Sequence, residues 1–387
     1  MNVTRILLPT LATLGVLAGG WVGYLNQQQE QMKPSQADAQ VKELQTDSFS
    51  LHLFQHALCE KTGNVLVAPH TLTHALSALK EIAAGKTLEE LNHLQLTEES
   101  TPRSAEPLAA ALLAMDYNLP RSAELHGVMP LPFSDNLPMA LSLFNGLLIP
   151  ATANASLQMA DSNMVTSRTR LLAGCTSHCK LDWEIPFHPA NSCTADFDSA
   201  SGGMPHFHQM RSRGMYRMVR AADNSWQAVV LPFKAQSADA HPSLVFIGIL
   251  PAGDARAFAS ALTPARLTSI RKELAATTPE DTLVELPRLE QIVLPYDMRD
   301  SLRRLGLKAL FDTEAADFSP LTPQKIHLGA FIQSISVHLT ESATKVPADD
   351  ALNYAARVIS FTRPFIWLIT DLDSGTPVDY FGLVEEI

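Results

Sequence analysis

Residues 361–384 read "FTRPFIWLITDLDSGTPVDYFGLV", and their first half is an apolar run bounded by Pro364 and Asp371. Short apolar or alternating runs bounded by Pro, Gly or Asp are typical of β-strands. Five more such runs precede it: "LSLFNGLLI" from residue 141, "QAVVLPF" from 227, "SLVFIGILP" from 243, "TLVELPRL" from 282 and "HLGAFIQSISVHL" from 327. The second half of the chain is therefore predicted to be mainly strand.

Helical patterns gather in the first part of the chain. Apolar residues at helical spacing predict helices over residues 47–60 and 70–85, the second ended by Gly85. Thr87 and Glu90 have the spacing of a capping box and predict a third helix. A fourth is expected at residues 106–118, and a short one at 298–305, stopped by Gly306. Early helices followed by strands favour the α+β class.

The composition excludes several classes of protein. The chain has 387 residues, of which 46% are hydrophobic and 18% charged, so it is long and apolar enough to bury a large core. Its net charge of −11 argues against binding to nucleic acid.

The N-terminus differs from the rest. Residues 6–25 carry no charge and follow Arg5, as expected of a signal peptide or an uncleaved membrane anchor. Residues 26–46 are Gln-rich and polar and predict a flexible tether, with the folded domain over 47–387. We therefore expect an extracytoplasmic protein that meets the membrane only through residues 6–25, if they are uncleaved.

The densest cluster of Cys and His is "CTSHCKLDWEIPFHPANSC", residues 175–193. If it begins with a strand, Cys175 and Cys179 share a face at roughly 13 Å and cannot bridge each other. His178 then points to the opposite face, which disfavours zinc. Free buried thiols, a disulfide from Cys193 to Cys175 or Cys179, and a zinc site remain the alternatives, in that order, and we predict no metal or cofactor. "MPHFHQM", residues 204–210, is interpreted as a loop, and no enzyme motif is present.

Five segments in order resemble the serpin family of serine protease inhibitors. They are "GNVLVAPHTLTHALSALKEIAAGKTLEEL", "KLDWEIPFHPANS", "VVLPF…LVFIGILPAGD", "VELPRLEQIVLPYDMRDSLRRLGLKALFDTEAADFSPLT" and the opening stretch, with the family's signature positions at Trp183, Phe187, Pro189, Arg363, Pro364, Phe365, Phe381 and Gly382. The resemblance implies three β-sheets, about eight helices, no enzymatic activity and a serine or cysteine protease as partner.

The resemblance also places a reactive-centre loop at "LTESATKVPADDALNYAAR", residues 339–357. In serpins this loop is a protease bait that inserts into the main sheet after cleavage and traps the protease. Its hinge is expected at Glu341, Thr344 and Ala348, which agree with the family pattern.

The rest of the loop departs from that pattern. Pro347 cannot donate a hydrogen bond to a sheet. Asp350 would share the buried face of an inserted strand with Val346, at a cost of several kcal/mol. Insertion is therefore expected to be hindered.

Two further departures concern the main sheet. Its sheet-opening region, near Trp183, would hold Ala68, Cys175 and Gln333 in place of the family's Ser, Asn and His. The segment near 147–167 is short, so the helix that crosses the main sheet is expected to be shortened or absent.

Two functions remain open. The first is an exported serpin-like scaffold or protease substrate with weakened or lost inhibition. The alternative is an active inhibitor of a trypsin-like protease, with Arg357 as bait ahead of Val358, because Arg357 lies sixteen residues after Glu341.

Overall fold

The computed structural model describes residues 36–94, 108–122, 127–149, 157–234, 244–341, 352, 355–372 and 378–387. The chain divides into a first unit, Met1–Glu43, and a compact second unit, Leu44–Ile387. Of the first unit only the start of one helix is described. Predictions for residues 1–35 lie outside the described residues, and no described helix is long and apolar enough to span a membrane.

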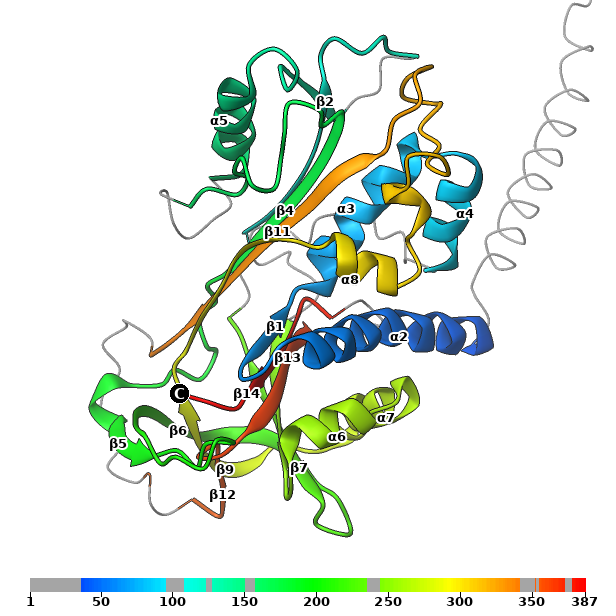
Figure 1. Cartoon of the computed structure of the whole chain (residues 1–387). Helices are drawn as coiled ribbons and strands as arrows, with labels where there is room; N and C mark the ends of the chain where they lie inside the picture. The colour runs from blue at the N-terminus through cyan, green and yellow to red at the C-terminus, as the bar shows by residue number, and fades with distance from the viewer. Residues whose placement is uncertain are drawn as a thin grey trace, which may run out of the picture. The chain divides into compact units, whose positions relative to one another are not determined.

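Seven α-helices occur among the described residues, close to the predicted number (Figure 1). They are α2 (Gln36–Glu60), α3 (Pro69–Ile82), α4 (Gly85–His93), α5 (Leu137–Leu148), α6 (Ala255–Ala261), α7 (Pro264–Ala276) and α8 (Arg299–Arg304), with two short 3₁₀ turns, η2 (Pro189–Asn191) and η3 (Ala309–Phe311). Side-chain caps fix several N-termini: Asn136 accepts from the Met139 amide and Thr263 from the Arg266 amide. Because α2 begins at Gln36, the last part of the expected tether is helical.

A five-stranded sheet is the main scaffold of the second unit. Its order is β10 (Leu289–Asp297), β11 (Leu328–Leu339), β4 (Leu171–Cys179), β2 (Leu108–Asp116) and β3 (Val128–Leu131). Strands β11 and β4 are parallel and lie side by side at its centre, whereas β10 and β2 run antiparallel to them. The inner face packs on α3 through Leu72, Leu76 and Leu79.

The other strands form one bent, nine-stranded sheet. Its order is β1 (Val65–Val67), β14 (Tyr380–Val384), β13 (Phe365–Asp371), β8 (Leu244–Pro251), β7 (Trp226–Pro232), β6 (His206–Arg220), β9 (Glu280–Pro287) and β12 (Arg357–Ser360), with β5 (Cys193–Asp196) beside β6. The prediction of three sheets is therefore wrong by this count. The 15-residue strand β6 joins two of them, pairing with β5 and β9 in its first part and with β7 in its last four residues.

Two predicted elements have the opposite type. Residues 106–118, predicted as helix, contain strand β2, because pairing with β4 and β3 overrides the helix propensity of its Ala and Leu residues. "LSLFNGLLI", predicted as strand, belongs to helix α5, whose apolar residues lie on several sides and conceal the helical period.

Smaller corrections concern α4. Gly85 is its first residue rather than the end of α3, and it has a positive φ of 48°. The predicted capping box is also wrong: the Thr87 hydroxyl accepts from the Asp317 amide and the Glu90 carboxylate from the Ala309 amide. The predicted strands over 227–233, 243–251, 282–289 and 327–339 and the helix ended by Gly306 are confirmed.

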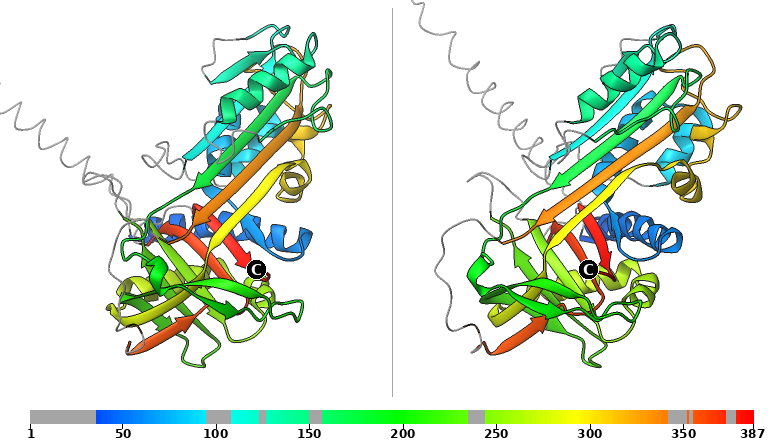
Figure 2. Two further views of the ribbon diagram at one scale, coloured as in Figure 1. Left: turned by 90° about the vertical axis from the view of Figure 1, so that its left-hand side faces the viewer. Right: turned by 60° about the vertical axis from the view of Figure 1, so that its left-hand side comes forward.

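Helix α5 covers the outer face of the five-stranded sheet (Figure 2). Its residues Ala140, Phe144 and Leu148 are buried against the sheet. A Cβ on Gly174 of β4 would lie 2.6 Å from Phe144, so glycine permits this close approach. Of the two expected alternatives, an absent covering helix is therefore wrong, because α5 lies on this face and precedes most of the short segment 147–167. A shortened one stays a prediction.

Candidate functional site: hinge and seam of the five-stranded sheet

The seam between β4 and β11 is closed along its length. Cα partners run from Leu328 and Leu171 to Val337 and Cys179, with one shift of register near the start. Among the described residues, no strand lies between β4 and β11. A strand inserted into this sheet would have to separate these two.

The loop after β11 is only partly described. Thr340 and Glu341 follow the strand directly, whereas the predicted hinge residues Thr344, Val346, Pro347, Ala348 and Asp350 lie outside the described residues. The chain is described again at the buried Leu352 and from Ala355 onward. It then enters β12, which pairs with β9 in parallel.

Glu341 is the best-connected side chain of this region. Its carboxylate is only 4% exposed. Arg288 donates from Nε to Oε2 at 2.8 Å and from Nη2 to Oε1 at 3.2 Å. The Ser192 hydroxyl donates to Oε1 at 2.7 Å, and His208 Nε2 lies 2.6 Å from the same oxygen. Three separate segments thus hold the base of the loop.

These donors keep Glu341 ionised. Burial alone would raise the pKa of the carboxyl, but the hydrogen bonds from Arg288 and Ser192, its own amide and His208 outweigh burial and lower the pKa to about 2. The carboxylate is therefore charged at all physiological pH values.

Trp183 holds the backbone next to Glu341. Its indole Nε1 donates to the Thr340 carbonyl at 2.9 Å, and its ring is buried among Phe187, Phe233 and Phe246. Trp183, expected near the sheet-opening region, thus contacts the residue directly before Glu341.

The middle of the seam contains Cys175 and Gln333, two of the residues expected in the sheet-opening region. The two residues are direct partners across β4 and β11, and both are fully buried. Gln333 Nε2 donates to Cys175 Sγ at 3.5 Å, and Tyr296 Oη donates to Gln333 Oε1 at 3.5 Å. Burial raises the pKa of the Cys175 thiol to about 12, so this thiol stays neutral and unreactive.

Ala68 does not take part in this pair. It is a buried residue directly before α3 and belongs to a different apolar cluster from Cys175. Its methyl group has no hydrogen-bonding capacity. On the outer face of the seam, His178 Nδ1 lies 2.9 Å from the Ser336 hydroxyl and connects β4 to β11.

Arg357 and Val358 are the first two residues of β12. Arg357 lies opposite Thr282 of β9, and its Nε contacts the Glu280 carboxylate. Both side chains are about half exposed, 45% for Arg357 and 50% for Val358.

The cysteines form no disulfide. All four are free, with Cys175 and Cys179 buried and Cys59 and Cys193 exposed, so the disulfide alternative is wrong. The described part of the chain contains no group of three His, Cys, Asp or Glu residues placed to hold a metal ion.

Sequence reasoning missed three partners of Glu341: Ser192, His208 and Arg288. The interpretation of "MPHFHQM" as a loop is wrong, because residues 206–210 belong to β6. Exposed His206 and His208 alternate with buried Phe207 and Gln209. This alternation with a period of two is the sequence signal that could have predicted a strand here.

A family model decides the identity of the fold. The model described as "Serpin (serine protease inhibitor)" matches residues 126–382, about two thirds of the chain. The chain belongs to the serpin family. The serpin family consists of protease inhibitors rather than enzymes, and serpins generally bind target proteases.

Sequence relatives are distant. This serpin is 21% identical to human glia-derived nexin over 216 residues, covering 54% of this chain and 52% of the relative. It is 26% identical to alpha-1-antiproteinase F of Cavia porcellus over 203 residues, covering 51% and 47%. The matched region thus spans about half the length of these curated relatives.

Solved structures match more completely. Maspin superimposes with a TM-score of 0.76 at 19% identity, covering 90% of this serpin and 99% of maspin. Uncleaved ovalbumin has a TM-score of 0.76 at 16% identity, covering 89% and 99%. At such identities the likeness establishes the fold alone.

Proposed function

We propose that this serpin presents an exposed loop that a protease cleaves, but that the cleaved loop inserts poorly into the sheet. The protein then acts as a binding scaffold or a protease substrate, with inhibition weakened or lost. The main support for this proposal is the paired seam between β4 and β11. Residues 342–356 can insert into the sheet only if these two strands separate.

The sequence of the loop opposes that insertion. A strand fed from Glu341 along the paired length of the seam takes in on the order of ten residues. Pro347 and Asp350 fall within that stretch. Pro347 withholds a ladder hydrogen bond, and Asp350 brings a carboxylate toward the buried face.

The hinge contacts act in the same direction. Glu341 must give up some or all of its bonds to Arg288, His208 and Ser192 before the end of β11 can move away from its surroundings. Hydrogen bonds to a charged group are about twice as strong as neutral ones. If the release of Glu341 is slow, loop insertion is delayed. A bound protease then has time to complete cleavage and dissociate.

The alternative is an active inhibitor of a trypsin-like protease with Arg357 as bait. The half-exposed side chains of Arg357 and Val358 favour it. However, Arg357 is already paired with β9 and with Glu280, so β12 would have to separate from β9 before a protease could bind the Arg357–Val358 bond in an extended form.

We also propose that the domain is exported. The support is the uncharged run at residues 6–25, which suits a signal peptide or an anchor.

One assay separates the two functions. The chain is incubated with a trypsin-like and a subtilisin-like protease and examined after denaturation. We expect cleavage within residues 342–356 and no covalent complex. A denaturant-stable complex that Arg357→Ala abolishes and Lys345→Ala leaves intact would establish the alternative.

A further inference from the structure

Helix α5 has an apolar flank that no described residue buries. Its buried row, Ala140, Phe144 and Leu148, faces the sheet. One residue earlier along the chain, and thus about 100° round the helix axis, a second row is exposed to solvent. This row consists of Met139, 53% exposed, Leu143, 42%, and Leu147, 46%.

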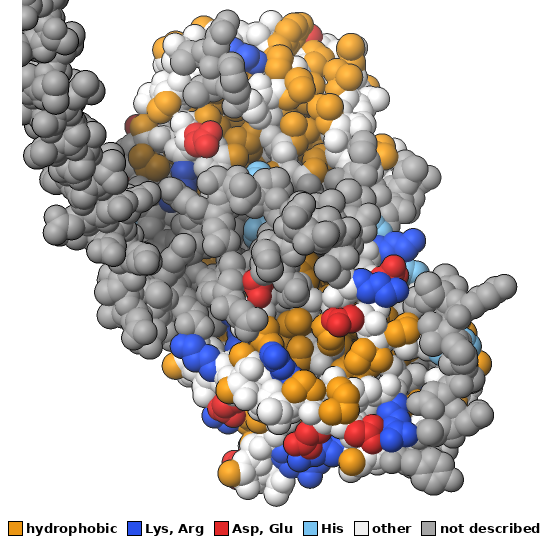
Figure 3. Space-filling model, turned by 180° about the vertical axis from the view of Figure 1, so that it is seen from behind, with side chains coloured by type: hydrophobic (Ala, Val, Ile, Leu, Met, Phe, Trp, Pro, Cys, Tyr) orange, Lys and Arg blue, Asp and Glu red, His pale blue; other side chains and the backbone are white. Residues whose placement is uncertain are grey.

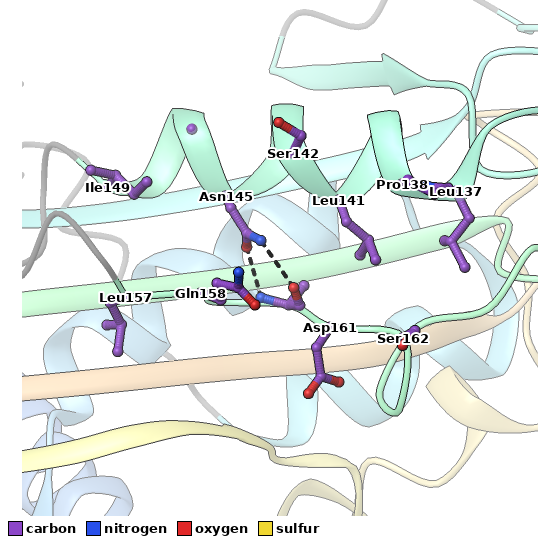
Figure 4. Close-up of a pocket in the computed structure, with 12 residues that line it drawn as sticks. Leu137, Pro138, Leu141, Ser142, Asn145, Ile149, Leu157, Gln158, Asp161 and Ser162 are labelled. Carbon is purple, nitrogen blue, oxygen red and sulfur yellow. Dashed lines mark hydrogen bonds between the residues drawn. The ribbon is translucent and has the colours of Figure 1, made fainter.

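The opposite flank of α5 is different. It borders a groove of about 710 Å³ that residues 157–162 close from the other side (Figure 4). Asn145 ties the two walls together, donating to the Ala160 carbonyl at 2.9 Å and accepting from its amide at 2.7 Å. The groove flank is therefore partly walled by residues 157–162, whereas the side chains of the Met139 row are exposed.

The open row continues onto the edge of the sheet. Met129 of β3 is 37% exposed and lies opposite Ala114, which faces the α5 side. Hydrophobic side chains gather at this end of the molecule when it is viewed from behind (Figure 3). We call Met129, Met139, Leu143 and Leu147 the α5 patch.

The sequence around the α5 patch contains no charge. Residues 136–160 include no Asp, Glu, Lys, Arg or His, although 18% of the whole chain is charged. A surface that meets water or a charged partner usually carries charged groups, and a contiguous apolar patch marks an interaction site. The partner must therefore be apolar.

We propose that the α5 patch binds the surface of a lipid bilayer, with its side chains entering the boundary between headgroups and acyl chains. The inference rests on the proposed export of the chain with residues 6–25 retained as an anchor, because only an uncleaved run would hold the domain near a membrane. About eighteen residues separate that run from the folded unit: the ten residues 26–35 reach at most about 36 Å, and the eight helical residues 36–43 add about 12 Å. The apolar side chains of the α5 patch suit a shallow contact at the interface between headgroups and acyl chains.

Docking through α5 has a functional consequence. Within the folded unit, α5 and β12 lie at opposite ends (Figures 1 and 2). A domain bound through α5 directs β12, and with it Arg357 and Val358, away from the bilayer, where a protease can reach them.

Site-specific photocrosslinking of the full chain tests this inference. The photoreactive amino acid p-benzoylphenylalanine replaces Leu143, and the chain is reconstituted into phosphatidylcholine vesicles, irradiated and analysed by mass spectrometry. A matched control carries the same amino acid in place of Ile292 on β10, which is 62% exposed. We expect a phospholipid adduct at position 143 at least tenfold more abundant than at 292, and Leu147→Glu should remove most of it.

Other outcomes contradict the inference in distinguishable ways. A chain that sediments with vesicles but gives no excess of lipid adduct at 143 contradicts docking and leaves the anchor intact. A chain that neither sediments nor forms an adduct contradicts both. Crosslinking of position 143 to a second protein chain would show that another copy covers the α5 patch instead.

Discussion

The hinge and the middle of the β4–β11 seam are held by different chemistry. At the hinge, a buried carboxylate receives hydrogen bonds from Arg288, Ser192 and His208. In the middle, Gln333 and Cys175 share one contact of 3.5 Å between an amide and a thiol. The side-chain contacts at the expected hinge are therefore charged hydrogen bonds from segments outside β4, whereas the middle of the seam has one weak polar contact and packing under α5 in addition to its backbone ladder.

The largest expected effect comes from removing the hinge carboxylate. Glu341→Ala leaves Arg288, Ser192 and His208 without their shared acceptor and should lower the free energy of unfolding by about 3 kcal/mol. Urea denaturation measures this. Glu290→Ala is the matched control, because the Glu290–His338 pair is about half exposed and should contribute less than about 1 kcal/mol. Equal losses in the two variants would contradict the assigned role of the hinge.

The dependence of the unfolding free energy on pH, measured at acid pH, tests the same carboxylate. The pKa of Glu341 is about 2 in the folded state, below its usual 4.5. Its contribution is therefore complete above pH 4.5 and is lost as the pH falls toward 2, and it amounts to about 3 kcal/mol. The difference in unfolding free energy between the wild type and Glu341→Gln should shrink by that amount over this window. A difference independent of pH would contradict the lowered pKa.

Changes in packing under α5 should alter the stability of the middle of the seam. Gly174→Val places a side chain where even a Cβ would lie 2.6 Å from Phe144 and 3.1 Å from Leu148. We expect a loss of about 2 kcal/mol, with α5 displaced from the sheet. Gly146→Ala is the control within α5, since nothing lies within 4 Å of its added Cβ. It should be neutral or stabilising by up to about 1 kcal/mol. A neutral Gly174→Val would show that α5 does not hold the seam.

The smallest effect is expected for the polar contact in the middle. Cys175→Ser retains an acceptor for Gln333 and should change the unfolding free energy by less than about 1 kcal/mol. Thermal unfolding checks this. A loss as large as that of Glu341→Ala would remove the proposed difference between hinge and middle.

Some of these features could be predicted from the sequence because they depend on local pattern. The strands β7, β8, β9 and β11 were found because their apolar runs end at Pro, Gly or Asp. The order of family-like segments assigned Cys175 and Gln333 to one region of the main sheet, whereas their direct pairing across β4 and β11 is visible only in the structure. Glu341 was identified as a hinge residue by the same order.

Other features depend on contacts between distant parts of the chain. The Ala- and Leu-rich β2 is a strand because β4 and β3 pair with it. Helix α5 is apolar on three sides, so no single period marked it as a helix. His208 reaches Glu341 from β6 and Arg288 from the junction between β9 and β10, and no local spacing in the sequence connects them to it.

The melting temperature before and after loop cleavage tests the central claim most directly. The chain is cut within residues 342–356 by a limited amount of protease and heated beside the intact chain. We expect little change, because Pro347 and Asp350 hinder insertion, and a clear rise in the double variant Pro347→Thr, Asp350→Ala. A sharp rise in the cleaved wild-type chain would show that the loop inserts and would contradict the account.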